Sequence, residues 1–202
     1  MDNYQLSRDR AQSYFLNFDQ TAILRQWELE HDDRWIYLSF LGKPYRVNRQ
    51  DGSIFRREDG AQAGFEEVLS IFDLLCHESS EKYLTGNFAP VNSLKGCPRA
   101  VGVGTDFHTK TASRFDADPA AFRQSCEALG GIPVPMGDIG YRFPVFQELS
   151  VILKFYHADE DFPASLTLLW EENTLQFLFY ETVFYVAGFL LHSITEEMKK
   201  QH

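Results

Sequence analysis

The sequence predicts an α+β fold in which a largely antiparallel sheet packs against helices. Two strand-like apolar runs, residues 151–156 and 164–170, are joined by the short acidic connector 157–163. Three shorter strand-like pieces lie nearer the N-terminus, whereas residues 65–76 repeat their apolar side chains at steps of three and four. Strands that follow one another closely favour antiparallel pairing, and amphipathic helices then cover the sheet.

The N-terminal part is expected to begin with helices and to continue as a meander of strands. Apolar side chains fall on one side of a helix from Leu6 to Phe18, which breaks near Asp19 and resumes through residues 23–27. Glycine, proline and an Asp-Gly pair then separate three strand-like pieces, residues 35–41, 45–48 and 53–56. Because Asp-Gly tolerates positive φ, these pieces are predicted to form antiparallel hairpins.

The C-terminal part is expected to open with an irregular segment and then alternate helix and strand. Residues 81–115 show no clear period and contain several glycines and prolines, which indicates a long loop. Asp118 and the proline after it predict a helix start, and Gly130 and Gly131 predict its end. A strand over residues 141–146 precedes the apolar pair described above, and a final helix begins near Glu181.

Length and composition predict a single globular domain over residues 1–202. A chain with 44% hydrophobic and 15% aromatic residues can bury one substantial core. The net charge is −10, and residues 101–202 carry 14 acidic and 7 basic side chains. Nucleic acid is therefore not expected as a partner, because binding phosphates needs a basic face.

Cysteine usage predicts a cytoplasmic protein. Cys76, Cys97 and Cys126 are an odd number at wide spacing, and they form no CxxC pair. The polar N-terminal residues do not resemble a signal peptide.

Residues 175–194 raise the alternative of a membrane helix, because Glu181 is their only full charge over about the length that crosses a bilayer. The carboxylate, Gln176 and Thr182 argue against insertion. We expect no membrane partner, and interpret this stretch as a buried strand that leads into a core helix.

A family resemblance rests on three features that occur in order: the motif of residues 40–47, the motif of residues 159–163 and the closing helix with Glu181. On these the chain resembles the uncharacterised prokaryotic family called domain of unknown function 3786. The resemblance supplies no reaction. It implies a context in anaerobic cofactor or redox metabolism, because some relatives are joined to an iron–sulfur segment. This chain lacks a cysteine cluster for such a centre, so a partner would carry any redox role.

The acidic connector is the first candidate site. His157, Asp159, Glu160 and Asp161 offer nitrogen and oxygen atoms to a divalent cation or to a polar ligand. The favoured alternative is a solvated hairpin loop, in which the acids stay in water and Phe162 helps to fix the return strand.

Glu181 is the second candidate. A carboxylate in an apolar run has its pKa raised by desolvation, as catalytic acids and bases often do. The favoured alternative places it in the first turn of its helix, where the free amides and the helix dipole stabilise its charge.

Three weaker patterns are interpreted structurally. Cys76 and His77 are adjacent on a helix and diverge, so core packing is preferred to a nucleophile and base. Residues 102–108 are glycine-rich but lack a third glycine, so a loop is preferred to a phosphate site; Cys97, Asp106 and His108 match no zinc spacing. The basic stretch, Lys43, Arg46, Arg49, Arg56 and Arg57, is expected on the wet face of strands rather than around an anion.

These observations favour a cytoplasmic binding or accessory module whose partner is a small molecule or a protein. The alternative is an enzyme or metal-dependent site that uses connector 157–163 and Glu181, and the sequence leaves both classes open. It identifies no cofactor, and candidate ligand-binding residues are His157, Asp159, Asp161 and Glu181.

Overall fold

The computed structural model describes residues 3–79, 82–98 and 106–201. Its N-terminal elements are α1 (Asn3–Asn17), α2 (Gln20–Trp27), β1 (Trp35–Phe40), β2 (Lys43–Asn48), β3 (Ile54–Arg56) and α3 (Phe65–Cys76). These are followed by β4 (Phe88–Pro90), η1 (Val91–Ser93), α4 (Asp106–Ala117), α5 (Pro119–Ala128), β5 (Ile132–Pro133), β6 (Ile139–Phe146), β7 (Leu149–Tyr156), β8 (Ser165–Glu171), η2 (Thr174–Gln176) and α6 (Tyr180–Lys199).

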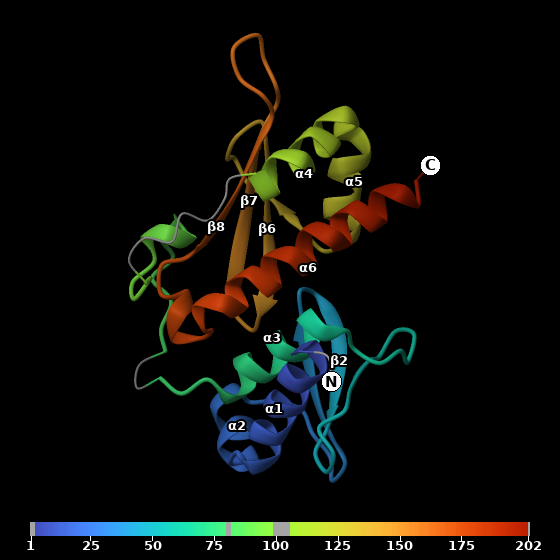
Figure 1. Cartoon of the computed structure of the whole chain (residues 1–202), viewed down its shortest axis with the longest axis vertical. Helices are drawn as coiled ribbons and strands as arrows, with labels where there is room; N and C mark the ends of the chain where they lie inside the picture. Colours follow the sequence, from blue (N-terminus) through green and yellow to red (C-terminus); the bar gives the residue numbers. More distant parts are fainter. Residues whose placement is uncertain (1–2, 80–81, 99–105, 202) are drawn as a thin grey trace.

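The described strands form two antiparallel sheets, and this confirms the predicted α+β class. One sheet has the order β1-β2-β3 and the other the order β4-β8-β7-β6-β5. In Figure 1 the small sheet lies beside α1 and α3, while α4, α5 and α6 cover one face of the large sheet. The sequence indicated one sheet. Two sheets form instead, and they meet where the Leu41 amide, just after β1, donates to the Val145 carbonyl of β6 at 3.0 Å.

Local capping explains where several helices begin. Asp19 ends α1 and starts α2, because its carboxylate accepts from the amides of Thr21 and Ala22 at 2.9 and 3.1 Å. Asp118 does the same for α5, through the amide of Ala121 at 2.9 Å. Both breaks follow from the sequence, since a short carboxylate satisfies amides that a helix start leaves free.

The turn before β3 depends on Gly52. Its φ is +70°, and a Cβ there would lie 2.8 Å from the side chain of Gln12. Asp51 completes the turn by accepting from the Ser53 amide at 2.8 Å. The expected Asp-Gly hairpin is therefore present, and it also lets α1 approach the small sheet closely.

A buried carboxylate joins the small sheet to α3. Glu67 Oε1 accepts from the Tyr45 hydroxyl at 2.6 Å and from Arg56 Nε at 2.7 Å, while Oε2 accepts from the Gly64 amide at 2.6 Å. Burial alone raises the pKa of Glu67, but the hydrogen bonds from Arg56, Tyr45 and the Gly64 amide outweigh it and hold that pKa below its usual value. Arg56 therefore lies on the helix-covered side, not on the wet face predicted for the basic stretch.

The large sheet packs its inner face on aromatic side chains of the helices. Phe115 of α4 stacks on Phe122 of α5 at 4.3 Å between ring centroids, and Phe122 contacts Phe155 of β7 at 5.3 Å. The helix α4 begins within the stretch predicted to be a loop. The prediction was wrong there because glycines and prolines dominate only as far as residue 104, and the remaining apolar signal is short.

The helix α6 crosses the molecule between the two sheets (Figure 1) and contacts α3 and α5. Its buried side chains are Thr182, Val183, Val186, Ala187, Leu190, Leu191, Ile194, Thr195 and Met198. A 3-10 turn, not the predicted strand, leads into it. Within the described residues, no helix has the length and apolar character needed to cross a membrane.

We expect Glu67→Gln to lower the free energy of unfolding by about 2–3 kcal/mol, because the neutral amide removes the buried charge paired with Arg56, and the exposed Asp59, 3.7 Å from Arg56 Nη1, replaces it only in part. Urea unfolding measures this, with the exposed Glu58→Gln as control. The native pKa of Glu67 is lowered, so its contribution is present above about pH 4.5 and is lost as the pH falls through the native pKa. An unchanged stability of Glu67→Gln at neutral pH would contradict this role.

Candidate functional site

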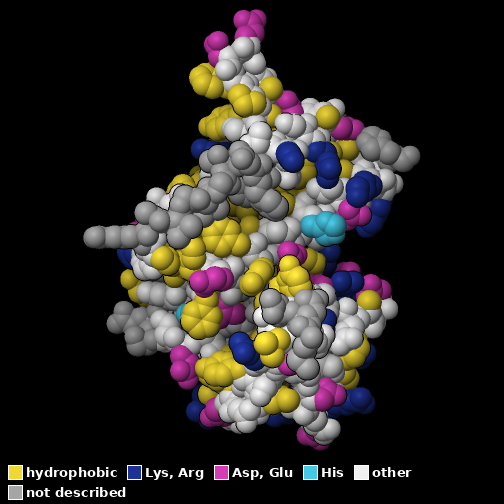
Figure 2. All heavy atoms as spheres, viewed as in Figure 1, with side chains coloured by type: hydrophobic (Ala, Val, Ile, Leu, Met, Phe, Trp, Pro, Cys, Tyr) yellow, Lys and Arg dark blue, Asp and Glu magenta, His cyan; other side chains and the backbone are white. Residues whose placement is uncertain are grey.

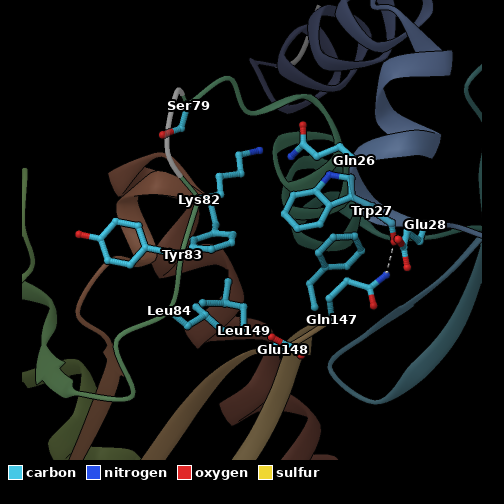
Figure 3. Close-up of a pocket in the computed structure, with 12 residues that line it drawn as sticks. Gln26, Trp27, Glu28, Ser79, Lys82, Tyr83, Leu84, Gln147, Glu148 and Leu149 are labelled. Atoms are coloured by element: carbon cyan, nitrogen blue, oxygen red, sulfur yellow. Dashed lines mark hydrogen bonds between the residues drawn. The ribbon is translucent and has the colours of Figure 1, made fainter.

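A pocket of about 550 Å³ lies where the end of α2, the β6–β7 turn and the segment before β4 meet (Figure 3). It is lined by Gln26, Trp27, Glu28, Ser79, Lys82, Tyr83, Leu84, Phe146, Gln147, Glu148, Leu149 and Phe177. The walls combine aromatic and aliphatic groups with side-chain amides, two carboxylates and one ammonium. Concave apolar pockets with a few converging polar groups are the usual form of small-molecule sites.

Backbone strain is concentrated around this pocket. Among the described residues, the non-glycine residues with positive φ are Glu28 at 50°, Leu41 at 47° and Gln147 at 50°. Glu28 and Gln147 line the pocket, and the Leu41 amide is bonded to β6 close by. Such conformations cost about 1–3 kcal/mol each and occur often at functional sites.

Lys82 provides the cationic group of the pocket. Its ammonium donates to the His77 carbonyl at 2.5 Å and lies 4.7 Å from the centre of the Trp27 ring. Desolvation by burial lowers the pKa of Lys82 to about 8, although the nearby charge of Asp73 opposes this shift. A lysine in this state can bind an anion when protonated and can act as a base or nucleophile when neutral.

Trp27 forms the central apolar wall. Its ring contacts Phe146 at 5.0 Å and Phe177 at 6.1 Å, so residues from three separate elements meet at one indole. Gln147 Nε2 donates to the Trp27 carbonyl at 3.1 Å, as Figure 3 shows. The indole Nε1 is buried and has no acceptor among the described residues, which is costly in a fully packed wall.

The C-terminal end of α3 supports the pocket from behind. Asp73 Oδ1 lies 3.2 Å from His77 Nδ1, and Asp73 Oδ2 accepts from the Phe179 amide at 2.8 Å. The His77 ring also packs on Phe179, with ring centroids 4.6 Å apart. Burial raises the pKa of Cys76 to about 12, so its thiol is a packing group, as interpreted from the sequence.

The connector 157–163 forms the tip of the β7–β8 hairpin and projects from the molecule (Figure 1). Asp159 Oδ1 accepts from the amides of Asp161 and Phe162 at 2.9 and 2.7 Å, so this carboxylate closes the turn. The Asp161 side chain is exposed. Phe162 was expected to help fix the return strand, but it is 70% exposed, and Asp159 holds the turn instead.

His157 lies at the base of the hairpin, among carboxylates that the sequence did not indicate. Its Nδ1 lies 2.6 Å from Asp116 Oδ1 of α4, and its amide donates to Asp138 Oδ2 at 2.9 Å. Glu181 is exposed in the first turn of α6. The hairpin projects at the top of Figure 1 and α6 begins well below it, so Glu181 and His157 are not brought together.

Within the part of the chain that the structure describes, no group of three or more His, Cys, Asp or Glu side chains is arranged to hold a metal ion. Of the glycine-rich stretch 102–108, residues 102–105 lie outside the described residues. The side chains of Asp106 and His108 are not described either. Sequence reasoning missed Lys82 and Trp27, because they are far apart in the chain and neither belongs to a motif.

Comparison with known families gives a match over most of the chain. The model of a family described as "Domain of unknown function (DUF3786)" matches residues 18–193, so the chain belongs to this family. The resemblance seen in the sequence is thereby confirmed. No curated protein and no solved structure matches the chain.

Replacing Lys82 by Met tests its burial through the pH dependence of stability. Below about pH 8 both the native and the unfolded Lys82 carry the proton, and the desolvation penalty is complete. Between about pH 8 and 10.5 the unfolded chain holds a proton that the native chain has lost, so stability rises with pH. We expect the wild type to gain about 1 kcal/mol over Lys82→Met across this range, which allows for a half-exposed group.

Urea unfolding from pH 7 to pH 10 measures this gain. The exposed Lys95→Met is the control and should show no such trend relative to the wild type. A constant difference between the wild type and Lys82→Met would show that Lys82 is not desolvated.

Proposed function

We propose that the protein is a binding module that holds a small molecule in the Trp27–Lys82 pocket. The observation that carries this proposal is the Lys82 ammonium, which is half-buried against the Trp27 ring in a pocket of about 550 Å³. A desolvated cation is destabilising in the free protein, and a bound anion would relieve that cost.

The lining favours a ligand with a flat apolar body and one acidic group. Trp27, Phe146 and Phe177 offer ring surfaces, while Lys82 offers an ammonium. Glu28 and Glu148 also line the pocket and would repel a ligand of high negative charge. An aromatic monocarboxylate fits this combination better than a polyphosphate does.

We further propose that residues 1–202 act as one domain and that the module is cytoplasmic. The hydrophobic core runs through both sheets without interruption, which supports a single unit. An accessory role in anaerobic cofactor or redox metabolism is consistent with the iron–sulfur segments joined to some relatives. In that role the redox chemistry would belong to a partner.

A second candidate is acid–base or ligand chemistry at the hairpin base. One observation favours it: Asp116 lies 2.6 Å from His157 Nδ1, an arrangement that would orient the imidazole so that its other nitrogen acts on a ligand. Asp159 and Asp161 would flank such a site, whereas Glu181 would not.

The test uses thermal-shift and calorimetric binding with benzoate, phenylacetate and indole-3-acetate, each paired with its neutral amide. We expect an acid to raise the melting temperature more than its amide does, because only the acid pairs with Lys82. The Lys82→Met variant should bind the acid at least about tenfold more weakly. Affinity should also fall as the pH rises through about 8, where Lys82 loses its proton.

Two further variants separate the candidates. Lys95→Met should bind like the wild type. Binding that survives in Lys82→Met but is lost in His157→Gln would move the site to the hairpin base, and absence of binding by every acid would reject the proposed ligand class.

A further inference from the structure

The β7–β8 hairpin is a braced arm. At its base His157 Nδ1 lies 2.6 Å from Asp116 Oδ1, and the Ala158 amide donates to Asp116 Oδ2 at 3.3 Å. Asp138 accepts from the His157 amide at 2.9 Å. The arm is therefore fixed to α4 and to the segment before β6, although its end projects furthest from the molecule in Figure 1.

The end of the arm presents an aromatic side chain on a rigid turn. We define the acidic tip as residues 159–162. Asp159 Oδ1 accepts from the amides of Asp161 and Phe162, and the Asp159 amide donates to the Phe162 carbonyl at 2.9 Å. Phe162 is held in place by its backbone while its ring is 70% exposed. A turn that is already ordered loses little entropy when its side chain enters a partner.

Negatively charged side chains surround the ring of Phe162. Asp159, Glu160 and Asp161 are exposed beside Phe162, and Figure 2 shows acidic and hydrophobic side chains together at the end of the arm. Tyr156 is 44% exposed where the arm begins. The partner that suits this tip carries positive charge and flat apolar surface.

The outer face of the small sheet has that chemistry. We define the arginine–aromatic face as Arg34, Trp35, Tyr37, Arg46, Phe55 and Arg57. Tyr37, Arg46 and Phe55 are directly paired across β1, β2 and β3, so they share one face. This is the side of the sheet opposite to the buried Ile36 and Val47.

The guanidinium groups of this face lie on its rings. Arg46 Cζ is 4.5 Å from the centre of the Trp35 ring and 5.7 Å from that of Phe55. Arg34 lies over Trp35 at 5.0 Å, and Arg57 lies over Tyr37 at 4.9 Å. Stacking fixes each plane and leaves N–H edges to bind carboxylates.

The charges of these arginines are not neutralised by ion pairs among the described residues. Among the described residues, Arg34, Arg46 and Arg57 form no ion pair, and Arg46 Nε is buried without a hydrogen-bond partner. Asp32 borders the face, but its carboxylate accepts from the Tyr37 hydroxyl at 2.7 Å. Tryptophan, tyrosine and arginine are also the residue types most common at the energetic centres of interfaces.

We propose that the acidic tip of one copy binds the arginine–aromatic face of a second copy of this chain, with Phe162 as the apolar anchor. Three carboxylates then meet three guanidinium groups. The contact is between copies because the tip and the small sheet lie at opposite ends of the long axis of one molecule (Figure 1).

Sedimentation velocity and light scattering on the full chain test the proposal. We expect the 23.3 kDa protein to associate as its concentration rises to about 500 μM at low salt, and to associate less at about 500 mM NaCl. Phe162→Ser and Arg57→Glu should each weaken association at least about tenfold. Both positions are exposed, so the variants should fold, which circular dichroism verifies.

Mixing the variants provides the sharpest readout. Phe162→Ser keeps an intact face and Arg57→Glu keeps an intact tip, so an equimolar mixture should recover one contact per pair and form a heterodimer. The matched controls are Phe179→Ser, whose ring is 60% exposed elsewhere, and Arg25→Glu. Both should associate like the wild type.

Three results would overturn the proposal. The first is a wild type that stays monomeric at low salt and high concentration. The second is association that persists in both Phe162→Ser and Arg57→Glu. The third is a monomeric wild type that binds a short oligothymidylate through Arg57, which would assign the face to nucleic acid.

Discussion

The burial of one face of α6 is the constraint on which the remaining structure depends. This helix contacts α3 beside the small sheet and α5 over the large sheet, so it links the two sheets within one hydrophobic core. Its start is fixed by Asp73, whose carboxylate accepts from the Phe179 amide. That bond also sets the position of the preceding turn and of Phe177 in the pocket wall.

The pocket is a consequence of this arrangement. Its wall comes from the end of α2, the β6–β7 turn and the segment before β4, which meet because α6 holds the sheets in place. Glu28 and Gln147 keep a left-handed backbone at this junction, and Lys82 keeps a half-buried ammonium. Both features oppose stability locally, and packing elsewhere must compensate for them. Such a combination is typical of positions where function, not folding, determines the residue.

Several carboxylates of this chain serve as hydrogen-bond acceptors that hold separate elements together. Glu67 joins the small sheet to α3, and Glu171 accepts from the Thr85 hydroxyl at 2.8 Å and from the Gly86 amide at 3.2 Å, which fastens the segment before β4 to β8. Asp116 braces the projecting hairpin. The net charge of −10 therefore does not describe a uniformly acidic surface. The surface instead has an acidic tip at one end of the molecule and a face of stacked arginines at the other.

The sequence by itself determined the elements whose signals are local. The α5 start at Asp118, the Asp-Gly turn before β3, the hairpin around residue 160 and the apolar stripe of α3 each depend on neighbours a few positions away. The short motifs also sufficed to indicate the family. Only the tertiary structure decided that Lys82 meets Trp27, that Asp116 meets His157 and that Glu181 stays away from the connector. These pairs are separated by long stretches of chain, so their distances follow from how helices and sheets pack, and no local spacing encodes them.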